Sequence, residues 1–236
     1  MVVAAIETSS PHGGVALVDG ETVIAEVSAL SRKTYSKRLL RSISYVLEES
    51  GLGWQDLDSV SVGLGPGSFT GLRIGLATAK GLCRATGASL VGIPTLDILA
   101  YQGVLSSKAL ICPVIDARRS QLYCAIYQCE SGSLDRISDY MMLYPQELPE
   151  KIPPGAEVLF LGSGLSAYGE LLESFLGKRA RFAPECFWYP RPALCGVLAG
   201  KRLSAGMAPD DPLTLVPLYI RPSDAEEKKR AREKAA

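Results

Sequence analysis

The residues best suited to holding an anion lie in a glycine-rich stretch from Gly63 to Gly75. Glycine occurs at positions 63, 65 and 67, where a short apolar run gives way to a helical pattern that continues to about residue 85. Glycine tolerates positive φ in such a turn and lets another backbone come close. Ser68 and Thr70 are good helix N-caps, and a helix N-terminus after a glycine loop favours an anion.

Three interpretations of this stretch compete. A nucleoside-triphosphate loop needs a GxxxxGK[ST] pattern, and no Lys-Ser or Lys-Thr pair follows the glycines. A dinucleotide-binding fingerprint needs a different spacing after Gly65. The third interpretation is a tight strand-to-helix turn that binds no ligand.

The helix that follows the glycine stretch has two apolar faces. We expect the face with larger side chains to cover a sheet; it consists of Leu72, Leu76, Ala79 and Cys83. A flat glycine face lies beside it, and another helix of this chain or of a partner could pack closely there. We predict a partner interface made of Thr70, Gly71, Gly75, Thr78 and Leu82, together with Arg38 and Tyr45 from a helix over 34–50.

The run GPGSFTGLRIGLATAKGL, residues 65–82, resembles the signature of the TsaB (YeaZ) family. These are bacterial accessory proteins in tRNA threonylcarbamoyladenosine synthesis, related to the O-sialoglycoprotein endopeptidase-like proteins. Shorter stretches at 5–9, 115–119 and 218–222 agree with the family in the same order along the chain. The resemblance implies an α/β actin-like ATPase fold, which belongs to the ribonuclease H-like (ASKHA) group.

The order of predicted elements is typical of that fold. Strands are expected at 2–6, 15–18, 22–27, 60–64, 90–93, 134–143 and 158–161, with helices at 34–50, 70–85, 94–104, 164–176 and 192–203 and a loop over 145–155. Ile115-Asp116 and Ala125-Ile126 repeat Ile6-Glu7 and Ala16-Leu17 at a constant offset of 109 residues, which indicates an internal duplication. We predict subdomains at 1–105 and 106–223 and a charged tail over 224–236. The first helix should bury Leu39, Leu40, Ile43, Val46 and Leu47.

The turns that hold a metal-bound nucleotide in actin-like ATPases depart from the pattern that the resemblance implies. Glu7 stands where an aspartate is expected, and Arg118 and Arg119 fill a second turn that is usually rich in glycine. Arginine could still contact phosphate, or it could form ion pairs. Gly162 and Gly164 resemble a turn that touches adenosine in nucleotide-binding relatives. Glu7, Arg118, Gly162 and Gly164 are therefore candidate nucleotide contacts, but we expect no cofactor bound firmly by this chain; ATP or ADP could be shared within a complex.

Composition limits the classes of partner and compartment. The 236 residues include 25 basic and 25 acidic residues, so no overall positive field attracts nucleic acid, and we expect tRNA to be contacted only indirectly. The six cysteines form no CxxC pair, and no apolar run reaches the roughly 18 residues that a membrane span needs. We expect a cytoplasmic protein without a membrane segment.

His12 is the one histidine of the chain, and we expect it to be a turn residue facing solvent. The sequence therefore cannot supply the two-histidine metal site that the resemblance implies for the catalytic paralogue, TsaD. We predict no catalytic residues and no metal site. The expected role is to bind and activate TsaD, with the ATPase subunit TsaE as a further possible partner and a homodimer in isolation. The alternatives are an ATP-dependent small-molecule kinase or ATPase of the same fold and, less well supported, a glycoprotease.

Overall fold

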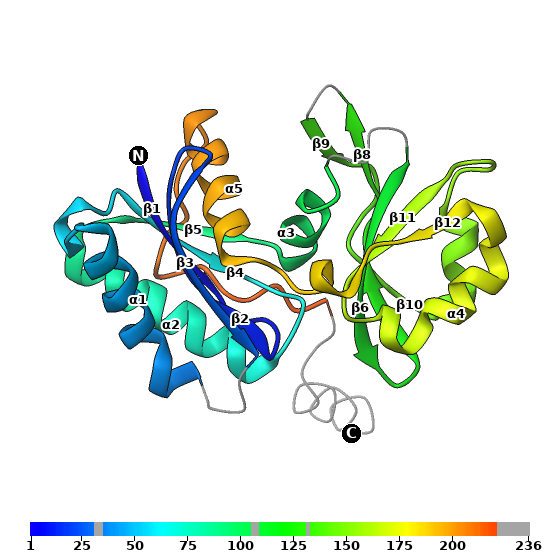
Figure 1. The fold of residues 1–236 in the computed structure, drawn as a ribbon, viewed down its shortest axis with the longest axis horizontal. Coiled ribbons are helices and arrows are strands. Elements are labelled where there is room, and N and C mark those ends of the chain that lie inside the picture. Colours follow the sequence, from blue (N-terminus) through cyan, green and yellow to red (C-terminus); the bar gives the residue numbers. More distant parts are fainter. Residues whose placement is uncertain (31–34, 105–108, 131–132, 221–236) are drawn as a thin grey trace, which may run out of the picture.

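The computed structural model describes residues 1–30, 35–104, 109–130 and 133–220, which form two α/β lobes side by side (Figure 1). The first lobe contains a five-stranded sheet in the order β3-β2-β1-β4-β5. Its strands are β1 (Val2–Glu7), β2 (His12–Asp19), β3 (Thr22–Leu30), β4 (Ser59–Gly63) and β5 (Ser89–Ile93). The first three strands pair antiparallel, and β4 and β5 run parallel to β1.

The second lobe repeats this sheet strand for strand. Its order is β10-β7-β6-β11-β12, in which β10, β7 and β6 pair antiparallel and β11 and β12 run parallel to β6. The strands are β6 (Leu110–Arg118), β7 (Gln121–Cys124), β10 (Met141–Leu143), β11 (Val158–Leu161) and β12 (Ala180–Phe182), and a hairpin of β8 (Tyr127–Glu130) and β9 (Ser133–Arg136) is attached to β6. The repeated order confirms the predicted duplication and the actin-like fold.

Helices cover both faces of the first sheet because residues along each strand alternate between its two sides. Ala4 and Ile6 of β1 pack beneath α1 (Tyr35–Ser50) and α2 (Phe69–Thr86). Val3 and Ala5 pack beneath α5 (Pro192–Ser204) on the opposite face. The other elements are α3 (Thr95–Tyr101), α4 (Leu165–Leu176) and the 3₁₀ turns η1 (Trp54–Asp56), η2 (Pro145–Lys151), η3 (Gly177–Arg179) and η4 (Glu185–Phe187).

The two lobes exchange one helix each. α3 follows the first sheet in the chain but packs against β6 of the second sheet, whereas α5 follows the second sheet and packs against β1 and β2. α5, which lies within the predicted subdomain 106–223, thus packs on the sheet of the first lobe. Gly196 lets α5 pack closely on β2, because a Cβ there would lie 2.7 Å from Val18 Cγ2.

Three local expectations differ from the structure. Leu40 is 56% exposed and lies outside the core of α1. The strand expected over 134–143 is divided into β9 and β10, because Ser138 Oγ accepts a hydrogen bond from Ile126 N at 2.8 Å and bends the chain between them. Residues 145–151 form η2 instead of a loop. The charged tail over 224–236 lies outside the described residues.

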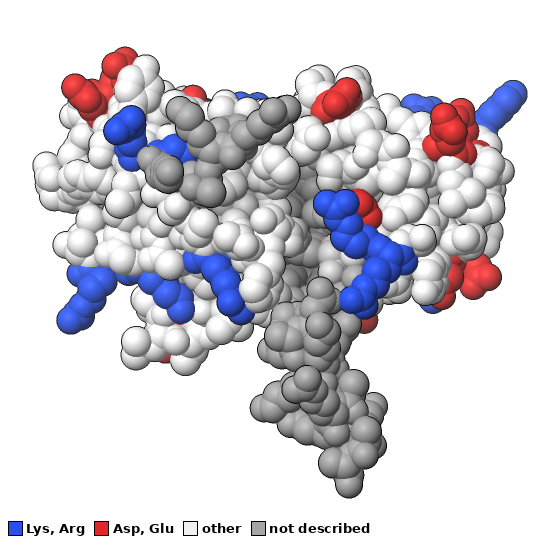
Figure 2. Space-filling view, turned by 90° about the horizontal axis from the view of Figure 1, so that it is seen from below, with Lys and Arg blue, Asp and Glu red and all other residues white. Residues whose placement is uncertain are grey.

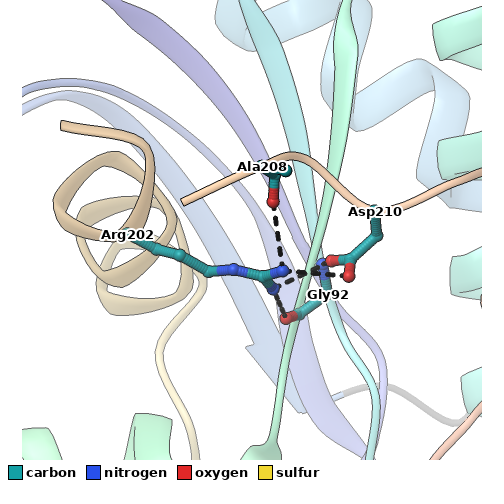
Figure 3. A network of polar contacts seen from close by, with 4 residues as sticks. All are labelled: Gly92, Arg202, Ala208 and Asp210. Carbon is teal, nitrogen blue, oxygen red and sulfur yellow. Dashed lines mark hydrogen bonds and ion pairs between the residues drawn. The ribbon is translucent and has the colours of Figure 1, made fainter. Parts of the chain in front are cut away.

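An arginine fork fastens the segment after α5 to β5, an edge strand of the first sheet (Figure 3). Arg202 donates to both carboxylate oxygens of Asp210, at 2.9 and 3.0 Å, and to the carbonyl oxygens of Gly92 and Ala208. Asp210 also accepts from Gly92 N at 2.8 Å. The backbone of β5 is thereby satisfied on its outer side, which protects the edge from pairing with another chain.

Replacing Arg202 with alanine should lower the free energy of unfolding by roughly 2–3 kcal/mol, because it leaves Asp210 desolvated without its cation. The Arg202 and Asp210 side chains are only 27% and 22% exposed, which supports a value well above that of a surface pair. Urea unfolding gives the measurement. Lys201→Ala is the matched control, since the adjacent Lys201–Glu21 pair is exposed and should contribute less than about 1 kcal/mol. Equal effects of the two substitutions would contradict this account.

Candidate functional site

A cleft of about 1050 Å³ lies between the lobes, where loops from both sheets meet. The first lobe contributes Ser9, Ser10, Pro11 and the glycine loop, and the second contributes Asp116, Arg118, Ser163 and Ser166. Aromatic side chains complete the walls: Phe69, Tyr123, Trp188, Tyr189 and Tyr219. The duplicated turns predicted from the sequence therefore do face one shared space.

The glycine loop packs tightly against the turn between β1 and β2. Ser68 N donates to Ser9 O at 2.6 Å, and Thr8 Oγ1 donates to Gly71 O at 2.9 Å. A Cβ at Gly67 or Gly71 would collide with the carbonyl oxygens of Ser9 or Thr8. Of the three interpretations of this stretch, the tight strand-to-helix turn is the one that accounts for these glycines.

The C-terminal family motif lies against the start of α2. Leu218 N donates to Leu64 O at 2.8 Å beside the glycine loop. The Arg73 guanidinium lies 3.7 Å from the centre of the Phe69 ring, and its Nε donates to Tyr219 Oη at 3.2 Å. The family motifs at 65–82 and 218–220 therefore pack against each other.

Glu7 does not reach the cleft. It is fully buried, and its Oε1 accepts a hydrogen bond from Ser9 N at 2.6 Å. Its Oε2 has no hydrogen-bond partner among the described residues. A Cβ at position 63 would collide with this oxygen, which explains why residue 63 is glycine. Burial raises the pKa of Glu7 from 4.5 to about 7, and the hydrogen bonds to Ser9 oppose that rise. The structure therefore places Glu7 in the interior and not among the residues that line the cleft.

The raised pKa of Glu7 makes stability depend on pH. Glu7 binds its proton more tightly in the folded chain, so the free energy of unfolding should fall as pH rises from about 4.5 to about 7 and level off above that. The total fall should be on the order of 3 kcal/mol, since one pKa unit corresponds to about 1.4 kcal/mol. Glu7→Gln should remove this slope in urea unfolding measured across the range, whereas Glu48→Gln on the exposed side of α1 should leave it. If the pH dependence of the unfolding free energy persists in Glu7→Gln, other titrating groups cause it.

The second turn, at the end of β6, is strained and is filled by arginine. Arg118, Arg119 and Ser120 have φ of 63°, 52° and 58°, a left-handed conformation that costs roughly 1–2 kcal/mol per residue other than glycine. Asp116 supports the turn by accepting from Arg118 N at 2.8 Å and from Tyr168 Oη at 3.1 Å. The Arg118 side chain is 87% exposed and lines the cleft. Figure 2 shows basic side chains gathered on this lobe.

Gly162 and Gly164 serve packing within the second lobe. A Cβ at either position would press against Val114 in the middle of β6, and Gly162 has φ of 115°. Neither glycine lines the cleft, although Ser163 between them does. Of the four predicted nucleotide contacts, Arg118 lines the cleft and the other three do not.

The residues present do not fit a metal-bound nucleotide held as in an actin-like ATPase. Gly13 and Gly14, at the start of β2, pack against Glu7 O and Val27 O, so the chain itself fills the space beside them. Glu7 is turned into the interior, and the second turn consists of Arg118, Arg119 and Ser120, where the family resemblance implies glycine. Within the described ranges, no group of three or more His, Cys, Asp or Glu could hold a metal ion.

His12 begins β2 and does not lie in a solvent-facing turn as expected. It is half-buried, and its ring meets the Tyr189 ring edge-on at 5.2 Å. The ring is therefore part of the wall between the first lobe and the segment that leads into α5.

The structure corrects the orientation of the glycine face on α2. Gly71, Gly75 and Leu82 are buried in the chain's own core, and a Cβ at Gly75 would collide with Thr8 Oγ1. The neighbour of this face is the end of β1, so the prediction that it receives a partner helix is wrong.

The other predicted interface residues have different environments. Thr70 and Tyr45 are exposed, and Thr78 is half-buried. Arg38 is half-buried too, with its guanidinium 3.4 Å from the carbonyl oxygens of Ala29 and Gly13.

A different row of small residues on α2 faces solvent. Ala77, Gly81 and Ala85 are exposed at four-residue spacing, opposite the row that covers the sheet, and a Cβ at Gly81 would meet nothing within 4 Å. α1 lies beside α2 and exposes Leu40 and Tyr45, 56% and 51% respectively. We call Leu40, Tyr45, Thr70, Ala77, Gly81 and Ala85 the α1–α2 face. In Figure 2 a broad uncharged area of this lobe lies beside a row of basic side chains. The four-residue spacing at 77, 81 and 85 is the signal that could have found this row.

The chain is similar to known proteins over nearly its whole length. Residues 23–229 match the family model described as TsaD, tRNA N6-adenosine threonylcarbamoyltransferase. The chain is 34% identical to the tRNA threonylcarbamoyladenosine biosynthesis protein TsaB of Bacillus subtilis, with 97% of each chain covered. It is 31% identical to the Escherichia coli protein of the same name over 72% of this chain and 75% of that one.

Solved structures agree on the fold. The chain superposes on YeaZ from Pseudomonas aeruginosa with a TM-score of 0.78 at 24% identity, covering 93% of this chain and 99% of the other. In the part of the chain that the structure describes, none of the helices is long and apolar enough to cross a membrane.

Proposed function

Because this chain belongs to the TsaB (YeaZ) family of tRNA threonylcarbamoyladenosine biosynthesis proteins, we propose that it is the accessory subunit that binds and activates the catalytic subunit, TsaD. TsaD then transfers the threonylcarbamoyl group to the adenosine beside the tRNA anticodon. The chain itself supplies no catalytic residue, contacts tRNA only indirectly and works in the cytoplasm. The ATPase subunit TsaE is a further proposed partner.

The α1–α2 face is the observation that supports this role. It presents small residues on one helix and apolar side chains on its neighbour, without burying them in the chain's own core. Small residues let a partner helix approach closely, and a specific interface of this kind buries on the order of 1,600 Å². A TsaD subunit of the same duplicated fold would pack helix on helix about a pseudo-two-fold axis. Without TsaD, the same face could form a homodimer by an isologous contact.

Reconstitution with purified components tests the proposal. The chain alone, given unmodified tRNA and the threonylcarbamoyl adenylate, should form no threonylcarbamoyladenosine, as measured by mass spectrometry of digested tRNA. TsaD with this chain should form it at least about tenfold faster than TsaD alone, which corresponds to about 1.4 kcal/mol. Product formed by the chain without TsaD would overturn the accessory role, and so would a TsaD rate that does not respond to the chain.

An ATP-dependent kinase or ATPase is the second candidate, because Arg118 projects into the cleft between the lobes. Titration calorimetry with ATP and Mg²⁺ separates the two functions. A micromolar dissociation constant, about −8 kcal/mol, would support the kinase. The packed glycines and the inward Glu7 favour much weaker binding by the isolated chain.

A further inference from the structure

A second pocket, of about 450 Å³, is lined by residues of α3, α5 and the β8–β9 hairpin. Its volume falls within the roughly 300–1,000 Å³ that is typical of small-molecule sites. Its walls come from both lobes and consist of Asp97, Tyr101, Tyr127, Ser133, Leu134, Arg136, Leu198 and Lys201. None of these residues lines the large cleft or belongs to the α1–α2 face.

Asp97 places a carboxylate in this pocket without an ion-pair partner. Its Oδ1 accepts hydrogen bonds from Tyr127 Oη at 2.5 Å and Tyr140 Oη at 2.8 Å, and Tyr140 also lies 2.9 Å from Oδ2. Asp97 belongs to none of the ion pairs among the described residues. Burial raises its pKa, and the hydrogen bonds from the two phenols and the nearby positive charge of Arg136 oppose that rise. Each carboxylate oxygen has more than one lone pair, so the group can accept a further donor.

Two cations line the same pocket. The Arg136 guanidinium lies 4.1 Å from the centre of the Tyr140 ring and donates to Ser138 O. Lys201 Nζ lies 5.5 Å from the centre of the Tyr101 ring and pairs with Glu21. Each retains free donors, since a guanidinium has five N–H groups and an ammonium three.

The mixed charge of the pocket restricts what it can hold. A simple amine would meet Asp97 but also two cations, and a simple anion would meet the cations but also Asp97. A molecule that carries both charges satisfies both sets of groups. Leu134, Leu198 and the Tyr101 ring add apolar wall, which suits a hydrophobic substituent.

We propose that this pocket binds a small zwitterion, an α-amino acid with an apolar side chain. Its ammonium group pairs with Asp97, its carboxylate with Arg136 and Lys201, and its side chain packs against Leu134 and Leu198. α3 connects this site to the glycine loop, because Thr95 N donates to Gly65 O at 2.7 Å and Gly65 N donates to Thr95 Oγ1 at 3.1 Å.

Three matched probes test the proposal on the full chain: L-leucine, isoamylamine, which is leucine without its carboxylate, and 4-methylpentanoate, which is leucine without its amine. Titration calorimetry should show L-leucine binding at least about tenfold more tightly than either analogue, or about 1.4 kcal/mol. Asp97→Asn keeps the shape and should remove the advantage over 4-methylpentanoate. Arg136→Gln with Lys201→Gln should remove the advantage over isoamylamine.

The proposal fails if no probe binds, if the three probes bind equally, or if the substitutions leave the L-leucine affinity unchanged. Arg136 is exposed and Lys201 is 43% exposed, so their substitution should leave the melting temperature unchanged. The result therefore stands even if Asp97→Asn proves unstable. Amide chemical shifts of Thr95–Tyr101 and Ser133–Arg136 locate binding at this pocket, and shifts confined to the large cleft would contradict it. Loss of TsaD activation does not enter this test, so the proposed function and the pocket are judged separately.

Discussion

Replacing Gly81 with leucine is expected to weaken binding of TsaD about 100-fold or more, while the chain alone melts at an unchanged or higher temperature. Gly81 is exposed on α2, and a side chain there meets no atom of the chain within 4 Å. Leucine also favours the helix by roughly 1 kcal/mol relative to glycine. In a close helix–helix contact, however, the same side chain would force the two axes apart.

Binding is measured by titration of TsaD against wild-type and Gly81→Leu chains, and folding is measured by thermal melting. Ala167→Leu is the matched control, because Ala167 is an exposed small residue on α4 in the second lobe. It should leave TsaD affinity unchanged. If Gly81→Leu binds TsaD as tightly as the wild type, the α1–α2 face is not the interface.

Gly75→Leu is expected to lower the free energy of unfolding by about 3 kcal/mol or more, because it overpacks a filled site. A Cβ at Gly75 would collide with Thr8 Oγ1 and lie 3.5 Å from Ile6 Cγ2. Thr8 cannot move aside freely, since its Oγ1 donates to Gly71 O and its carbonyl oxygen lies against Gly71. The gain in helix propensity, roughly 1 kcal/mol, offsets only part of that cost.

Urea unfolding of Gly75→Leu beside Gly81→Leu makes this a paired test on one helix. The first substitution should destabilise the chain, and the second should not. The opposite pattern would mean that α2 is rotated, with the Gly71–Gly75 face turned to the partner, as the sequence alone suggested.

The strands of the first sheet could be predicted from the sequence because they carry strong local signals. Short apolar runs and a hairpin at Asp19-Gly20 mark its strands, and the repeated Ile-acid pair indicates the duplication, whereas the order of the strands came from the structure. The neighbours of α2 could not be predicted in the same way. A helix with two apolar faces needs two neighbours, and periodicity does not reveal whether the second is a partner or the chain's own turn at Thr8.

The orientation of Glu7 could have been predicted from the same rule that gives the strands. Residues alternate along β1, so Glu7 shares a face with Val3 and Ala5, the face beneath α5. The family resemblance had instead led us to expect Glu7 at the cleft. No local pattern in α5 indicates that it returns to the first sheet. Its position depends on the apolar face that β1 leaves uncovered, and β1 lies more than 170 residues earlier in the chain.

The exchange of helices between the lobes has a consequence during synthesis. The first sheet is complete once β5 ends at Ile93, yet its second apolar face is covered only when α5 ends at Ser204, which is 204 − 93 = 111 residues later. Ribosomes add roughly 5–20 residues per second, so the nascent chain carries that bare face for on the order of ten seconds. The first lobe therefore cannot finish folding ahead of the second on the ribosome, and chaperones that recognise exposed apolar strands have that interval in which to bind it.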